Sequence, residues 1–500
     1  MNRNQKLRLN TISSLVSKFT ILLSGLILPR LILSNYGSEI NGLVSSVTQF
    51  LSVITFLDLG VGTVVQSALY KPLAQGDNQK ISNVLSYARK YFRNIALILL
   101  AYVLLLVIIY PQTIEISNLN ILGTIFLIIA ISIDQFGRYY FGIVNELLLN
   151  ADQKAYVQLG TEVILVLLNL IISILLIVKG FEIYTVKFVS GLIYLIRPMY
   201  LTYYVKNNYS IHANISNGED PLPQKWNGMA QHIAYSIQNS TDIVVLTIFS
   251  TLENISIYSV YNMVTNALKI LIQSFTIGLQ SFFGGLLAEE KYNTLKTSFS
   301  KIEWGIHNIA VFLYSLCAVL ITDFVMIYTS GVNDVNYAAP LFSTFLILGA
   351  FMYSIRTPYQ AVVFAAGHFK QTQLGSIIEA SMNIFISIFL VNYLGLVGVA
   401  IGSFVSLFYR TFYLINYLSK NILNLNRRLV LKQFFVDILV LVFITVPGIY
   451  ILSTYDIENL LQWIIVASLL TLYALVVQLI INVLFYKTLL LRLFKYEFKR

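Results

Sequence analysis

One apolar segment, residues 255–288, carries polar side chains at regular spacing. They are Ser259, Asn262, Asn266, Lys269, Gln273, Thr276 and Gln280. Steps of three and four place them on one face of a helix. Amide and hydroxyl groups hydrogen-bond polar ligands, and the lysine adds a positive charge that attracts anions. The pattern therefore predicts a polar binding face with Lys269 near its middle.

The apolar segment 39–68 repeats this arrangement without a basic residue. Its polar side chains are Asn41, Ser45, Gln49, Ser52, Thr55 and Asp58. Ser45, Ser52 and Thr55 correspond to Ser259, Asn266 and Lys269 at one constant offset along the chain. We therefore expect two equivalent polar faces.

Basic residues also lie inside apolar segments, and three stand beside prolines. Arg30 follows Pro29, Arg197 precedes Pro198 and Arg356 is two residues before Pro358; the other candidates are Lys18 and Arg138. A guanidinium group pairs with phosphate through two parallel hydrogen bonds, and prolines kink helices. These residues predict a cationic cavity that binds an anionic head group. For Arg138 the alternative is neutralisation by Asp134, one helical turn away.

Two acidic residues, Asp58 and Asp242, fall near the middle of apolar segments. An ionisable group at membrane depth usually marks an ion or substrate pathway. They are the candidates for binding a coupling ion, H⁺ or Na⁺. No other cofactor is expected. His232, His307 and His368 lack the spacing of metal ligands, and Cys317 has no partner cysteine.

The elements that carry these residues are apolar segments of membrane-spanning length. Of the 500 residues 57% are hydrophobic and 11% charged, against about 25% charged in ordinary soluble proteins. A helix that crosses a bilayer needs about 20 apolar residues. The expected spans are 11–34, 39–68, 93–110, 121–147, 157–178, 183–204, 228–250, 255–288, 304–327, 338–366, 373–391, 394–417, 433–453 and 460–486. This predicts an all-α polytopic membrane protein with about 14 transmembrane helices.

The basic residues outside the spans fall almost entirely in alternate loops. One set of loops, with both termini, holds nearly all of them, whereas the other set holds Lys179 alone. Because cytoplasmic loops are enriched in Lys and Arg, we expect both termini in the cytoplasm. The net charge of +10 reflects this bias and an affinity for anionic lipids. No basic soluble domain is present that would bind nucleic acid.

Similar residues recur between the two halves of the chain. Glu39 and Glu253 each open a span, and Gln158-Leu159-Gly160 matches Gln373-Leu374-Gly375, with Glu162 and Glu379 following. The recurrence favours two six-helix lobes related by pseudo-two-fold symmetry, although chance similarity among apolar segments remains the alternative. The expected domains are an N-lobe of helices 1–6 (1–216), a C-lobe of helices 7–12 (217–425), and helices 13–14 with a basic tail (426–500).

The chain resembles the polysaccharide-export flippases in topology over nearly its whole length, and in specific residues mainly within the first 90. The matching residues are Pro29-Arg30, Asn35-Tyr36-Gly37, Glu39-Ile40-Asn41-Gly42-Leu43 and Asp58-Leu59-Gly60. These flippases handle O-antigen, capsule and teichoic-type repeat units. They belong to the multidrug/oligosaccharidyl-lipid/polysaccharide exporter superfamily, which also contains multidrug and toxin extrusion carriers and the lipid II flippase.

The resemblance implies a multi-pass protein of the bacterial inner membrane that is not an enzyme. It would move an undecaprenyl-diphosphate-linked oligosaccharide to the outer leaflet by alternating access, for surface polysaccharide biosynthesis. The implied partners are this lipid, the bilayer, and the polysaccharide polymerase and export machinery. Basic residues of helices 1, 2 and 8 line the lipid II flippase cavity; Arg30 and Lys269 lie on matching helices, whereas helix 2 departs by carrying Asp58.

Three other functions stay open from the sequence. A lipid II flippase would share the fold, and so would a multidrug or toxin antiporter, which would need a cavity dominated by acidic and apolar groups. A membrane polymerase or glycosyltransferase would need a large external loop for its catalytic groups, and the external loops here are short.

Overall fold

The computed structural model describes residues 3–58, 61–114, 116–117, 119–211, 229–276, 278–425, 427–455 and 457–497, and the regular structure in these ranges is helical. The chain divides into two compact units. Unit 1 comprises Met1–Thr247 with Thr251–Ser256, and unit 2 comprises Ile248–Ser250 with Ile257–Arg500. Each unit is described by itself.

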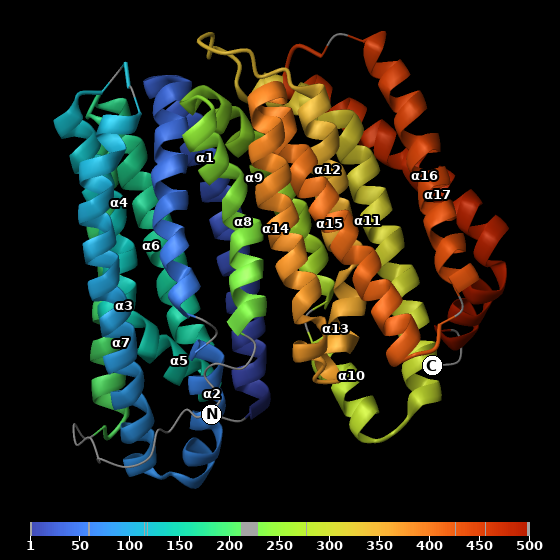
Figure 1. Ribbon diagram of the computed structural model, residues 1–500, viewed down its shortest axis with the longest axis horizontal. Helices are drawn as coiled ribbons and strands as arrows, with labels where there is room; N and C mark the ends of the chain where they lie inside the picture. Colours follow the sequence, from blue (N-terminus) through green and yellow to red (C-terminus); the bar gives the residue numbers. More distant parts are fainter. Residues whose placement is uncertain are drawn as a thin grey trace. The chain divides into compact units, whose positions relative to one another are not determined.

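Unit 1 contains the helices up to α8, which Figure 1 labels. They are α1 (Arg3–Ser52), the 3₁₀ helix η1 (Val53–Asp58), α2 (Val61–Gln75), α3 (Asn78–Thr113), α4 (Ile121–Gly137), the π-helix η2 (Arg138–Gly142), α5 (Ile143–Ala151), α6 (Ala155–Val178), α7 (Ile183–Asn208) and α8 (Met229–Phe249). Within this unit α1 packs on α6, α4 on α7, and α2 on α3 and α5.

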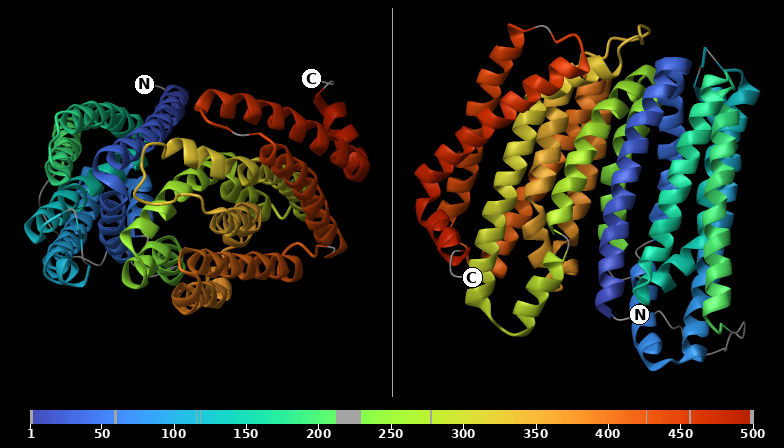
Figure 2. Two further views of the ribbon diagram at one scale, coloured as in Figure 1. Left: turned by 90° about the horizontal axis from the view of Figure 1, so that it is seen from above. Right: turned by 180° about the vertical axis from the view of Figure 1, so that it is seen from behind.

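Unit 2 contains the remaining helices, the first of which begins in unit 1. They are α9 (Leu252–Thr276), α10 (Leu279–Ala288), α11 (Tyr292–Tyr328), α12 (Pro340–Ile355), α13 (Thr357–Ala365), α14 (Phe369–Leu394), α15 (Leu396–Asn421), α16 (Arg427–Ser453) and α17 (Leu460–Glu497). The hairpin of α14 and α15 packs on α12, and both α16 and α17 pack on α11, at the edge of the unit seen in Figure 2.

Helices occur at every expected span, but their breaks differ from the sequence prediction. The first two spans share α1, which breaks at Gly37 in the left-handed region (φ 83°), where a side chain would be strained. The second span ends at Ser52, earlier than expected, because η1 follows. Among the described residues, eleven helices are long and apolar enough to cross a membrane. The count of fourteen and the lobe symmetry stay predictions.

The prolines beside arginines behave differently from one another. Helix α1 continues through Pro29 and α7 through Pro198, whereas the chain breaks at Arg356 between α12 and α13. A second break, η2, begins at Arg138. Two of the arginines therefore stand at helix breaks, where backbone groups are exposed and side chains are redirected.

Inside unit 1, the second half of α1 approaches α8 and the start of α9. The Asn41 amide donates to Ser256 Oγ at 2.8 Å, and the hydroxyl oxygens of Ser46 and Thr247 lie 2.7 Å apart. A Cβ on Gly42 would lie 1.8 Å from the Leu252 carbonyl oxygen. Only a glycine permits this backbone approach, and small residues commonly mediate such contacts in membranes.

Large apolar side chains cover the outer faces of several helices. Leu104 and Ile108 of α3 and Leu472 and Leu479 of α17 are about 60% exposed. A surface of this kind is stable against lipid tails but not against water. The structure thus agrees with a multi-pass membrane protein.

Candidate functional site

A polar cavity of about 480 Å³ lies inside unit 1 among α1, α4, η2, α6 and α7. Its charged lining residues are Asp134, Arg138, Glu146, Glu162 and Arg197. These side chains line one cavity because η2 interrupts the helix between α4 and α5, at the point where α7 packs against it. Gly142 permits the crossing, since a Cβ there would lie 2.9 Å from Pro198.

Both arginines of this cavity pair with glutamates. Arg197 lies 3.0 Å from Glu162 and 3.3 Å from Glu146, and Arg138 lies 3.6 Å from Glu146. The Ser17 hydroxyl donates to the other Glu162 oxygen at 2.7 Å, which ties α1 to this network. The structure adds this pair with Glu146 to the electrostatic interaction between Arg138 and Asp134 that the sequence offered as the alternative. The Nε of Arg197 has no hydrogen-bond partner among the described residues.

The lining of this cavity holds one more carboxyl group than guanidinium group. Excess negative charge at membrane depth is stable only if a proton or another cation compensates it. The chemistry of this cavity therefore suits cation binding better than phosphate binding.

The second charged cluster lies in unit 2 and contains more positive than negative groups. Glu379 of α14 lies 2.5 Å from Arg356 and 3.5 Å from Arg410 of α15, and all three residues are at least 94% buried. A second donor of Arg410 binds the carbonyl oxygen of Thr372 at 3.0 Å. One carboxylate thus faces two guanidinium groups, so the cluster carries a formal excess of one positive charge.

Tyr353 connects this cluster to the polar face of α9. The Arg356 guanidinium lies over the Tyr353 ring at 4.6 Å, and the Lys269 ammonium lies 5.7 Å from the same ring. The Gln273 amide donates to the Tyr353 hydroxyl at 3.0 Å. Three sequence-predicted residues, Lys269, Gln273 and Arg356, therefore converge on one tyrosine. A cation–π contact thus holds both cations against one aromatic ring.

The two clusters share an order of residue types along the chain. In each unit an arginine stands at a helix break (Arg138, Arg356), and a glutamate lies inside the next long helix, Glu162 in α6 and Glu379 in α14. A second arginine, Arg197 or Arg410, lies on the helix after that. The recurrence supports the predicted duplication.

The remaining predicted residues occupy α1, η1, α8 and α9. Lys18 and Arg30 are half-buried on α1, and Gln49 donates to the Ser52 hydroxyl at 2.7 Å. On α9, Asn262 is half-buried and Asn266 exposed, whereas Asp242 of α8 is buried. Asp58 ends η1, and its side chain lies outside the described residues, as does that of His232. The roles of all these residues stay predictions.

Sequence reasoning did not identify Glu146 or Tyr353 as members of the two clusters. It noted Glu162 and Glu379 only as repeat markers. A usable signal was present, because a carboxylate inside an apolar segment needs a partner, and the segments carrying Arg197 and Arg410 supply one.

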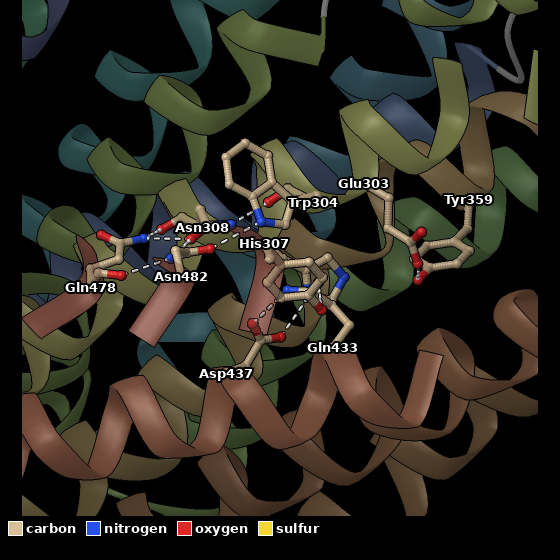
Figure 3. Close-up of polar contacts among 10 residues, drawn as sticks. Glu303, Trp304, His307, Asn308, Tyr359, Gln433, Asp437, Gln478 and Asn482 are labelled. Carbon is tan, nitrogen blue, oxygen red and sulfur yellow. Dashed lines mark hydrogen bonds and ion pairs between the residues drawn. The ribbon is translucent and has the colours of Figure 1, made fainter. Parts of the chain in front are cut away.

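A third polar cluster joins α16 and α17 to α11 (Figure 3). His307 Nδ1 and Asp437 Oδ2 lie 2.6 Å apart, and Gln433 donates to the other Asp437 oxygen at 3.0 Å. Beside them Trp304 donates to Asn482 at 3.0 Å, and Tyr359 donates to Glu303. Hydrogen bonds of this kind between helices hold membrane bundles together. We infer that they fix α16 and α17 to unit 2.

Replacing Asp437 with leucine is expected to destabilise the protein by about 3 kcal/mol or more, because a buried His307 and Gln433 would lose their partner. Thermal unfolding in detergent measures the effect. Ile438→Ala is the matched control, since the neighbouring Ile438 side chain is 59% exposed. Equal unfolding temperatures for Asp437→Leu and wild type would contradict the assigned role of the cluster.

Solved structures with the same fold are transporters. The lipid II flippase MurJ in its inward closed conformation superposes with a TM-score of 0.73 at 14% identity, covering 96% of this chain and 100% of that one. An inward-facing multidrug resistance MATE transporter of the MOP superfamily gives 0.63 at 16% identity, covering 81% and 96%. The MATE multidrug transporter DinF-BH gives 0.58 at 12% identity, covering 85% and 98%.

No protein-family model matches the sequence, and no curated protein matches it. The structural likeness shows that this chain has the fold that MurJ and the MATE transporters share.

Proposed function

We propose that this protein is a flippase of the bacterial inner membrane. It moves an undecaprenyl-diphosphate-linked oligosaccharide repeat unit from the cytoplasmic to the outer leaflet by alternating access, with both termini in the cytoplasm. The observation that carries the proposal is the unit 2 cluster, in which Arg356 and Arg410 outnumber the one carboxylate of Glu379, with Lys269 against the same Tyr353 ring as Arg356. A diphosphate group supplies the missing negative charge.

Two features favour a lipid-linked substrate over a cationic drug. The match to MurJ extends over 96% of the chain, whereas the MATE match covers 81%, and the difference is about the length of α16 and α17 together. In addition, the α9 face presents Lys269 beside neutral amides, which suits an anionic head group with sugars.

A lipid II flippase is the second candidate. The full-length fold match to MurJ favours it, and lipid II offers the same diphosphate to the cationic cluster. The two substrates differ in their sugars, so only a direct comparison of transport separates the proposals.

The membrane potential is a sufficient source of direction for either substrate. With the inside negative, moving one negative charge outward gains about 2.3 kcal/mol per 100 mV. A coupling ion, H⁺ or Na⁺, would bind acidic groups instead. Its candidates are Asp58 and Asp242, together with the carboxyl-rich cavity of unit 1.

Transport in proteoliposomes tests the proposed function. A labelled undecaprenyl-diphosphate oligosaccharide, lipid II and a cationic dye are compared with and without an imposed potential. Lys269→Ala and Arg30→Ala are expected to slow oligosaccharide transport about tenfold, as expected when a charge-assisted hydrogen bond is lost. Lys370→Ala is the control, because this lysine is exposed. Transport of the dye alone would refute the proposal.

A further inference from the structure

A second cavity in unit 1, separate from the acid-rich one, is lined by basic and aromatic side chains. It has a volume of about 280 Å³, close to the lower limit of about 300 Å³ for small-molecule pockets. Arg89 and Arg93 of α3 line it together with Lys206 near the end of α7. Tyr140 and Tyr209 complete the aromatic part of the lining.

The three cations of this cavity have no acidic partner among the described residues. Arg89 and Arg93 are one helical turn apart on α3, where like charges destabilise a helix. Arg93 is held by stacking, with its guanidinium 5.0 Å from the Tyr140 ring centroid. Stacking leaves the N–H groups at the edge of the guanidinium available to a ligand.

The carboxylate of Asp152, which contacts the lining residue Tyr209, already has three partners. Asp152 accepts from the Tyr209 hydroxyl at 2.6 Å and lies 2.7 Å from Lys154 and 3.2 Å from Lys6. Burial acts to raise the pKa of Asp152, but hydrogen bonds from Lys154 and Tyr209 outweigh it, so the pKa is lowered and the carboxylate stays ionised at neutral pH. Its charge is matched by Lys6 and Lys154 and cannot balance the arginines.

Two neutral polar residues of the lining, Asn145 and Thr202, already have hydrogen-bond partners within the protein. The Asn145 amide donates to the Phe141 carbonyl oxygen at 3.1 Å and to the Thr202 hydroxyl at 3.0 Å. The Thr202 hydroxyl in turn donates to the Pro198 carbonyl oxygen at 2.7 Å. The charged donors of the lining therefore all belong to Arg89, Arg93 and Lys206.

We propose that Arg89, Arg93 and Lys206 form a binding site for a phosphate-bearing anion, distinct from the site of the transported head group. Guanidinium groups bind phosphate through paired hydrogen bonds, and basic pockets between transmembrane helices on the cytoplasmic side bind phospholipid head groups. The basic residues of the 71–93 segment place this end of unit 1 at the cytoplasmic surface. The phosphate comes from an anionic phospholipid or from an anion in solution.

Native mass spectrometry and calorimetry distinguish the two sources. Protein released from nanodiscs of phosphatidylglycerol or phosphatidylcholine is weighed for retained lipid, and detergent-solubilised protein is titrated with inorganic pyrophosphate. Retention of phosphatidylglycerol without pyrophosphate binding identifies a lipid head group, whereas pyrophosphate binding that depends on Arg89 and Arg93 identifies a soluble anion. Wild type is expected to bind at least one of them.

The Arg89→Gln/Arg93→Gln variant is expected to lose that binding at least about tenfold, because two charge-assisted contacts are removed. Lys71→Gln/Lys90→Gln removes two exposed charges near this end of unit 1 and should bind like wild type. Arg89→Lys keeps the charge and should bind at an intermediate level. It tests the site even if the double variant does not fold. Equal binding by both double variants, or no binding of either probe to wild type, would overturn the proposal.

Discussion

Oxidation of a Ser46→Cys/Thr247→Cys variant is expected to link α1 to α8 and to stop transport of the lipid-linked oligosaccharide. The two hydroxyl oxygens lie 2.7 Å apart, and the pair is buried, so the introduced sulfur atoms come within bonding reach. The native Cys317 is buried and does not compete for the oxidant. The loss should be nearly complete and should reverse on reduction.

The expected block follows from alternating access. The sequence predicts Ser46 in the N-lobe and Thr247 in the C-lobe, with a boundary at 216–217 that lies outside the described residues. The structure holds both residues within unit 1. The close approach at Gly42 holds α1 against the start of α9, the helix that follows α8. If transport requires this contact to open, a covalent bond across it traps one state.

A cross-link inside one predicted lobe is the matched control. The Asn383 amide donates to the Ser403 hydroxyl at 2.8 Å between α14 and α15. An Asn383→Cys/Ser403→Cys bond should form more slowly, because the cysteine side chain is shorter than the asparagine side chain that it replaces, and should leave transport intact. Equal transport by the oxidised and reduced Ser46→Cys/Thr247→Cys variant would contradict alternating access at this contact.

The sequence predicted the helix positions well because apolar length is a local property. The positions of the helix breaks were harder to predict, because each break depends on a few residues. At Gly37 a single residue leaves helical backbone angles while α1 continues on both sides of it. At Arg138 a π-helix begins and changes the directions of the side chains that follow. At this π-helix Arg138 reaches Glu146 as well as Asp134, a second partner that spacing along the chain does not indicate.

The site was predicted in part for a similar reason. Periodicity placed Lys269 and Gln273 on one helical face, and the structure brings both to Tyr353. Periodicity does not report partners on other helices, so the pairs Arg197–Glu162 and His307–Asp437 were not predicted. The lack of metal-ligand spacing around His307 argues against a metal site only. A buried histidine can also pair with a carboxylate, as His307 does with Asp437.

Replacing Glu379 with leucine is expected to destabilise the protein by about 3–5 kcal/mol, because Arg356 and Arg410 would remain buried without a carboxylate. The two arginines are only 5% and 3% exposed, so the loss of Glu379 leaves two buried charges without a compensating carboxylate. Thermal unfolding in detergent measures the loss. Glu379→Asp, which keeps the charge on a shorter side chain, should lose less.

A triple variant separates stability from transport at this cluster. Changing Glu379, Arg356 and Arg410 together to leucine removes every charge, and apolar replacement of a whole buried ion cluster is commonly neutral or stabilising. We therefore expect the triple variant to unfold near the wild-type temperature, well above Glu379→Leu, yet to transport no lipid-linked oligosaccharide. Wild-type transport by a stable triple variant would mean that the cluster serves packing alone, and that the diphosphate binds elsewhere.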